Sequence, residues 1–192
     1  MAMDAGAPEK AKIVIVGTGP VGSLAALYAS VHHDNVEVYE LRGDDRHTSS
    51  STSSMLQKTI NFTLSERGIR ALEKSGRTDL LSVIMCTAIP MCGRIIHGRS
   101  ATRQLTEIFH PYDVHGNSLY SLDRTALNRA LRQEIEKTTN VKTFFHHKLV
   151  RTDLTARKTW LDQRGPITAP ATREVDFDFL IGADGAHSIM RQ

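Results

Sequence analysis

A glycine-rich turn between an apolar run and a helical pattern dominates the start of the sequence. Residues 12–22 read Lys-Ile-Val-Ile-Val-Gly-Thr-Gly-Pro-Val-Gly, which places a buried strand before a Gly-x-Gly-x-x-Gly turn. Residues 21–32 then carry apolar side chains at helical spacing, namely Leu24, Leu27, Tyr28 and Val31. A second strand is predicted over residues 36–40. Because crossovers between parallel strands are right-handed by default, this pattern predicts the start of a doubly wound, Rossmann-like α/β sheet.

The spacing of the glycines predicts a dinucleotide site. Gly17 permits the tight turn, Gly19 lets the backbone approach a pyrophosphate, and Gly22 lets the helix pack against the sheet. The helix N-terminus then presents free N–H groups and its positive dipole end to the phosphates. Glu40 is expected to accept hydrogen bonds from the adenosine ribose, and its charge disfavours NADP in this pocket. Two interpretations remain for Arg42: it contacts the adenine or a phosphate, or it is a solvated loop arginine.

The end of the sequence carries a second strand and turn. Residues 178–182 are mostly apolar and lead into Ala183-Asp184-Gly185, with Ser188 and Arg191 close behind. Asp184 on a turn permitted by Gly185 could accept hydrogen bonds from groups of a ribityl or pyrophosphate moiety. An ordinary Asp-Gly turn is the alternative, but it does not explain the agreement with the first fingerprint. An NAD-dependent dehydrogenase is disfavoured because the Asp184 turn would have no role in it.

Composition excludes several other classes. Lys and Arg number 24 against 21 Asp and Glu, and the net charge of +3 without a basic run argues against nucleic acid. No apolar run approaches the ~20 residues of a membrane span, so the chain alone is expected to be soluble and cytoplasmic. His97, His110 and His115 have no spacing that suits a metal site, and none is predicted.

The middle of the chain reads as a mixture of helices and short strands. A Ser-rich loop over residues 47–54 precedes a helix expected to start at the capping box of residues 63–66, and a shorter helix is expected over residues 78–85. Asp123 is expected to cap a further helix that ends near Lys137. Short strands are predicted over residues 94–97, 118–120, 141–145, 149–154, 159–162 and 177–181.

Several segments resemble the kynurenine 3-monooxygenase family of flavin-dependent aromatic hydroxylases. The closing strand and turn resemble the DG motif of these hydroxylases, and the other matching segments are residues 59–68, 89–97, 111–112 and 120–128. The resemblance implies hydroxylation of L-kynurenine to 3-hydroxykynurenine with FAD, NADPH and O₂, in tryptophan degradation by the kynurenine pathway and in NAD biosynthesis. No catalytic side chain is expected, because the protein's task is to place the aromatic ring and to exclude water.

The resemblance also assigns residues to the substrate and to the flavin. Arg94 is expected to hold the amino-acid carboxylate as a two-pronged donor, and Tyr112 to add a hydroxyl and an aromatic wall. Arg124 is expected to reach the ribityl or phosphate region of FAD. Without the resemblance these three would read as a surface ion pair, a half-buried turn residue and a charge in a first helical turn. The remaining candidates for FAD contact are Val21, Tyr39, Thr63 and Leu149.

The sequence also departs from the family pattern. Residues 53–58 stand where the family has a basic, glycine-containing segment. Family members continue into a Gly-Asp motif, further substrate-pocket residues and, in eukaryotes, a membrane anchor that implies the mitochondrial outer membrane. Residues 1–192 are therefore expected to be an incomplete FAD-binding domain, with substrate-subdomain strands inserted at about 86–121. We expect this chain alone to bind FAD weakly or not at all and to be inactive. The alternatives are a non-catalytic flavin-binding fragment and another aromatic hydroxylase of the family.

Overall fold

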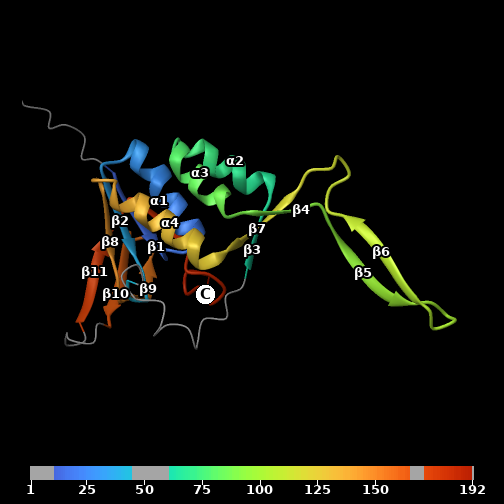
Figure 1. The fold of residues 1–192 in the computed structure, drawn as a ribbon. Helices are drawn as coiled ribbons and strands as arrows, with labels where there is room; N and C mark the ends of the chain where they lie inside the picture. Colours follow the sequence, from blue (N-terminus) through green and yellow to red (C-terminus); the bar gives the residue numbers. More distant parts are fainter. Residues whose placement is uncertain (1–10, 45–60, 165–170, 192) are drawn as a thin grey trace, which may run out of the picture. The chain divides into compact units, whose positions relative to one another are not determined.

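The computed structural model describes residues 11–44, 61–164 and 171–191 (Figure 1). The chain divides into two compact units. Unit 1 comprises Met1–Gln57 and Leu131–Gln192, and unit 2 comprises Lys58–Ala130. The Ser-rich segment and the segment that departs from the family pattern lie outside the described residues.

Unit 1 is built on a parallel sheet that contains both glycine fingerprints. Within the described residues its strand order is β12-β1-β2-β8, and all of these pairs are parallel. The strands are β1 (Lys12–Val16), β2 (Asn35–Tyr39), β8 (Val141–Phe144) and β12 (Phe179–Gly182). Helix α1 (Pro20–His32) makes the crossover from β1 to β2 and packs on both strands. The predicted doubly wound α/β sheet is confirmed, and β1 and β12 are direct neighbours in it.

The face of α1 that lies against the sheet consists mainly of small residues. Its buried residues are Gly22, Ser23, Ala26 and Leu27. Tyr28 and Val31, which belong to the predicted apolar stripe, are 36% and 60% exposed. That part of the prediction is wrong because close packing of this helix against the sheet requires small side chains, which a pattern of large apolar residues does not reveal.

Asn140 holds the C-terminal end of α1. Its side-chain amide donates to the carbonyl oxygens of Ser30 and His33, at 2.8 and 2.7 Å. The last carbonyls of a helix have no partner within the helix, so a side-chain donor satisfies them. The carbonyl of Asn140 also accepts a hydrogen bond from the N–H of Val36 at 3.2 Å. One residue thus joins the end of α1, the start of β2 and the start of β8.

An antiparallel sheet shares the core of unit 1 with the parallel sheet. It consists of β9 (His147–Asp153), β10 (Lys158–Gln163) and β11 (Ala171–Asp176), in the order β11-β10-β9. The buried cluster between the two sheets contains Val14, Tyr39, Leu161, Val175 and Phe177. Because successive residues of a strand point to opposite faces, Ile13 and Ile15 lie on the other face of β1, toward α1.

Strand β11 is absent from the sequence-based prediction. Val175 is its only buried residue, and the others are exposed. Its six residues pair with β10 in an unbroken antiparallel register from Ala171 to Asp176. A strand with a single inward apolar side chain gives almost no hydrophobic alternation, so pairing with β10 rather than its own pattern accounts for it.

Unit 2 contains a helical pair and a small antiparallel sheet. Helix α2 spans Glu66–Lys74, and α3 spans Thr78–Cys86 as expected within one residue. The sheet has the order β3-β7-β4, with β3 at Asn61–Leu64, β7 at Leu119–Asp123 and β4 at Ile89–Met91. The predicted helix start at Thr63 is wrong, because Thr63 pairs with Ser121 within β3 and β7. Ser65 is the N-cap of α2, and its side chain makes no capping hydrogen bond.

Helix α4 (Arg124–Glu136) follows β7 directly, and its start is confirmed. The Asp123 carboxylate accepts hydrogen bonds from the N–H groups of Thr125 and Ala126 at 2.6 and 3.1 Å, which is an N-cap arrangement. Unit 2 also contains β5 (Gly93–Arg99) and β6 (Leu105–Pro111), which form a two-stranded antiparallel ribbon (Figure 1).

The core of unit 1 provides a test of the fold. Leu161 is fully buried between the two sheets, so Leu161→Ala should lower the free energy of unfolding by about 2–5 kcal/mol. Leu154→Ala makes the same change at a side chain that is 70% exposed, and should alter that free energy by less than about 0.5 kcal/mol. Urea unfolding followed by circular dichroism measures both, and equal losses would contradict the assigned core.

Candidate functional site

The turn between β1 and α1 depends on two glycines for its shape. Gly17 adopts φ +103°, and a Cβ there would overlap the carbonyl of Ala183. A Cβ on Gly22 would overlap the carbonyl oxygen of Gly17 and would lie 3.1 Å from the Ala183 Cβ. Both glycines are therefore needed for the turn to close against α1 and the end of β12.

Gly19 differs from the other two glycines because the space around it is open. A Cβ on Gly19 would meet nothing within 4 Å, and its φ of −67° is accessible to any residue. Gly19 is the N-cap of α1, and no acidic residue occupies the first turn of that helix. An open backbone at an uncompensated helix N-terminus is the arrangement that a pyrophosphate requires.

Glu40 lies directly after β2 and is held by residues on both sides. One carboxylate oxygen, Oε2, accepts hydrogen bonds from the N–H and the Oγ1 of Thr18, at 2.8 and 2.9 Å. The other, Oε1, accepts the N–H of Arg42 at 2.9 Å. Glu40 is only 8% exposed and Thr18 is fully buried. The predicted ribose acceptor is thus coupled to the glycine turn through Thr18.

The Asp184 turn lies beside the glycine turn at the carboxyl ends of β1 and β12. The Ala183 N–H donates to the Val16 carbonyl at 2.8 Å, which continues the pairing of these strands beyond β12. Asp184 Oδ2 accepts the N–H of Ile189 at 2.9 Å, and Gly185 adopts φ +81°. Ligands of open α/β sheets bind at the carboxyl ends of the strands, so the two fingerprints meet where such a ligand would lie.

Tyr39 and Leu149, two of the predicted FAD contacts, have buried side chains. The Tyr39 ring lies in the core, stacked on Phe144 with centroids 4.8 Å apart, and its hydroxyl donates to Glu37 at 2.7 Å. Burial raises the pKa of Tyr39, and the neighbouring Glu37 carboxylate raises it further. The backbone of Tyr39 belongs to the turn, because its carbonyl accepts the Gly17 N–H at 2.7 Å. Leu149 is 4% exposed, whereas Val21, in the first turn of α1, is 71% exposed.

Unit 2 carries two further predicted FAD contacts, Arg124 and Thr63. The Arg124 guanidinium lies over the Phe62 ring, 5.2 Å from its centroid. Thr63 occupies an exposed position of β3, the strand that also contains Phe62.

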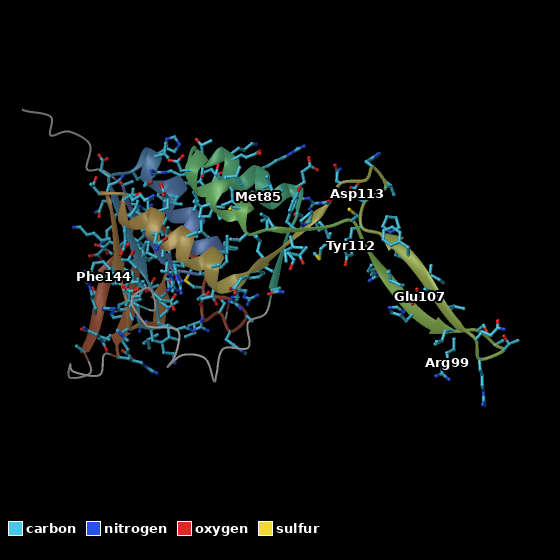
Figure 2. The ribbon with its side chains drawn as sticks, viewed as in Figure 1. Met85, Arg99, Glu107, Tyr112, Asp113 and Phe144 are labelled. Carbon is cyan, nitrogen blue, oxygen red and sulfur yellow. The ribbon has the colours of Figure 1, made fainter. Side chains whose placement is uncertain are left out.

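The register of the β5–β6 ribbon brings the two predicted substrate residues to one face. Arg94 pairs with His110, and the Tyr112 N–H donates to the Cys92 carbonyl at 3.0 Å, which continues the ladder by one pair. Opposite residues of an antiparallel pair share a face, so Arg94, His110 and Tyr112 lie on the same face and within reach of one another. Figure 2 labels Tyr112 near the base of the ribbon and Arg99 near its tip. Tyr112 is 42% exposed.

The other face of the ribbon has a different character. Ile95 pairs with Phe109 on that face, and His97 pairs with Glu107, with the His97 Nδ1 and Glu107 Oε1 3.0 Å apart. Ile96 and Ile108 form an apolar pair on the Arg94 face. The four apolar side chains are 40–59% exposed, so within the described residues both faces of the ribbon lack a cover.

These residues fit the adenosine and pyrophosphate part of a dinucleotide. The open Gly19 backbone suits phosphates, and the buried Glu40 carboxylate suits hydroxyl donors. Among the described residues, no group of His, Cys, Asp or Glu is arranged to hold a metal ion. No helix in the described parts of the chain has both the length and the hydropathy to cross a bilayer. Sequence reasoning gave Thr18 and Ala183 no role of their own, because neither motif depends on their side chains.

Alanine substitutions at Gly22 and Gly19 should have different effects, on stability and on FAD binding respectively. Gly22→Ala should lower the free energy of unfolding by about 1–3 kcal/mol, because its methyl group would overlap the Gly17 backbone. Gly19→Ala should change it by less than about 1 kcal/mol but weaken FAD binding about tenfold or more, because its methyl group would enter the open space at the helix N-terminus. Urea unfolding and flavin fluorescence titration measure the two effects. An unchanged FAD affinity in Gly19→Ala would contradict this assignment.

Curated relatives match nearly all of the chain. It is 67% identical over 193 residues to kynurenine 3-monooxygenase 2 of Aspergillus niger, a match that covers 94% of this chain and 39% of the relative. It is 53% identical over 191 residues to kynurenine 3-monooxygenase of Neosartorya fischeri, covering 95% of this chain and 37% of the relative. The chain thus spans under two-fifths of the length of these relatives.

Solved structures share the fold at low sequence identity. The flavin-dependent monooxygenase PieE, in complex with FAD and substrate, superposes with a TM-score of 0.67 at 20% identity, covering 94% of this chain and 31% of PieE. The p-nitrophenol 4-monooxygenase PnpA of Pseudomonas putida gives a TM-score of 0.64 at 21% identity, covering 95% and 42%. A family model described as FAD binding domain matches residues 10–192. The paired glycine and aspartate turns of unit 1 thus occur in a sequence that belongs, over nearly its whole length, to the FAD binding domain family.

Proposed function

We propose that these residues serve an FAD- and NADPH-dependent monooxygenase that hydroxylates L-kynurenine to 3-hydroxykynurenine. The observation that carries the proposal is the common face of Arg94 and Tyr112, set by the ribbon register in a chain of the FAD binding domain family. The name kynurenine 3-monooxygenase on the similar relatives supports the same substrate. For a full-length eukaryotic member the proposal includes the mitochondrial outer membrane as its location.

The proposed FAD contacts include backbone groups, carboxylates and further side chains. In the proposal, Gly17, Gly19 and Gly22 form the pyrophosphate turn, and Val21 lies beside it in the first turn of α1. Glu40 accepts from the adenosine ribose, and Asp184 with Gly185 faces the ribityl or pyrophosphate region. Arg42, Tyr39, Leu149, Thr63 and Arg124 complete the proposed FAD-binding residues.

The proposed substrate site rests on the Arg94 face of the ribbon. A guanidinium offers two parallel donors to a carboxylate, which suits the amino-acid end of kynurenine. Tyr112 lies diagonally across the ladder from Arg94, where its hydroxyl can add a third donor. FAD supplies the activation of O₂ when it is bound and reduced. The work of the protein is to hold the aromatic ring in place and to exclude water. In the same proposal, residues 86–121 belong to the substrate subdomain.

A non-catalytic flavin-binding fragment is the second candidate function. The uncovered apolar pairs Ile95–Phe109 and Ile96–Ile108 favour it for the chain by itself, because a substrate site on an open two-stranded ribbon would not exclude water.

Joining the chain to the remainder of a relative tests the two candidates. Alone, residues 1–192 should show no NADPH oxidation that depends on kynurenine. Fused at Gln192 to the part of the Aspergillus niger relative beyond the matched region, they should oxidise NADPH on addition of kynurenine and form 3-hydroxykynurenine, measured by absorbance and by chromatography. A fusion that binds FAD without turnover would favour the fragment. Turnover with a different aromatic acid alone would indicate another hydroxylase.

Arg94 can be compared with a matched arginine on the same strand. In the fusion, Arg94→Ala should raise the KM for kynurenine about a hundredfold, because the carboxylate would lose a two-pronged charged donor. Arg99→Ala removes an arginine from the opposite face of the ribbon and should leave the KM within about threefold. Steady-state kinetics measures both variants, and similar values of KM would exclude Arg94 as the carboxylate ligand.

A further inference from the structure

Thr18 is a buried polar residue inside the glycine turn, between two glycines whose roles are set by backbone geometry. Its side chain is fully buried, yet its Oγ1 lies 2.9 Å from Glu40 Oε2. Its N–H donates to the same oxygen at 2.8 Å. Its carbonyl accepts the Ser23 Oγ at 3.1 Å, which ties it to α1. Thr18 therefore connects the start of α1, the turn and the acidic residue after β2.

The hydrogen bonds of Glu40 leave one acceptor position for a ligand. A carboxylate has about four lone-pair positions, two on each oxygen. The two donors of Thr18 use both positions on Oε2, and the Arg42 N–H uses one on Oε1. Among the described residues no further donor reaches Glu40, so one position on Oε1 is available.

The burial of Glu40 makes the two bonds from Thr18 important for its orientation. A carboxylate that is 8% exposed has little water to replace a lost donor, and a side chain without fixed donors would sample other rotamers. The Thr18 N–H alone fixes one point, whereas N–H and Oγ1 together fix the direction of the Oε2 lone pairs.

We propose that Thr18 is a positioning residue for the adenosine ribose of FAD, which acts by holding Glu40 Oε2 within the protein and presenting Oε1 to a ribose hydroxyl. The proposal rests on the proposed FAD function of this turn. It assigns to the residue between Gly17 and Gly19 a side-chain role that the glycine spacing does not require.

Substitutions at Thr18 and at a matched threonine test this role. In the fusion at Gln192, Thr18→Val removes the hydroxyl at nearly constant volume and should weaken FAD binding about tenfold, in a flavin fluorescence titration. Thr18→Ser keeps the hydroxyl and should stay within about threefold. Thr159→Val removes the hydroxyl of another fully buried threonine in unit 1, on β10, and should leave FAD affinity unchanged.

A double-mutant cycle distinguishes positioning from general destabilisation. In a Glu40→Ala background, Thr18→Val should no longer weaken FAD binding, because no side-chain acceptor is left at position 40 for Thr18 to orient. Equal FAD affinity of Thr18→Val and the unsubstituted fusion would overturn the proposal, as would an unchanged effect in the Glu40→Ala background. If the unsubstituted fusion binds no FAD, the proposed FAD-dependent function fails, which is a separate outcome. Urea unfolding without FAD then decides on the contact between Thr18 and Glu40. Non-additive effects of the two substitutions on the free energy of unfolding support it, and additive effects overturn it.

Discussion

The close approach of two backbone turns, one at each end of the chain, is the constraint on which unit 1 depends. Gly17 has no Cβ, and this allows the Ala183 carbonyl to lie where a side chain would otherwise be. The same contact sets β12 beside β1 and places Asp184 near the glycine turn. Gly22 extends the packing into α1, whose sheet-facing residues are mostly small. The approach of the Ala183 turn, the packing of α1 and the position of both fingerprints therefore require side chains that are missing or small at these sites.

Features with a local chemical cause were accessible from the sequence, and features that arise from pairing were not. The strand-turn-helix unit, the Asp123 cap and the α3 boundaries each depend on neighbours along the chain, and the structure confirms them. Thr63 reads as a helix start because its local sequence resembles a capping box, but pairing with Ser121 prevails. Strand β11 exists through its ladder with β10. The link from Thr18 to Glu40 joins residues 22 positions apart, which no local pattern reveals.

The candidate site also contains features that the sequence predicts and features that depend on strand pairing. The glycine spacing and Glu40 could be placed from sequence because a dinucleotide turn has a fixed chemistry. The common face of Arg94 and Tyr112 could not, because it depends on the pairing of β5 with β6 and on the extra pair formed by Cys92. A slip of one residue in that register would send Arg94 to the opposite face from Tyr112. Within the described residues, the Ile95–Phe109 and Ile96–Ile108 pairs are exposed, so burial of apolar side chains does not specify this register.

The Asn140 contact with the end of α1 has a consequence for how the protein folds during synthesis. The amide of Asn140 reaches Ser30 and His33 across 110 and 107 positions, and β1 gains its outer neighbour only from β12. The N-terminal β-α-β segment therefore leaves the ribosome with both sheet edges and its helix end unpaired. All of unit 2 is translated before these partners appear. Such high contact order slows folding and exposes strand edges, so the nucleotide turn is completed only after its last partner, Ala183, has been synthesised.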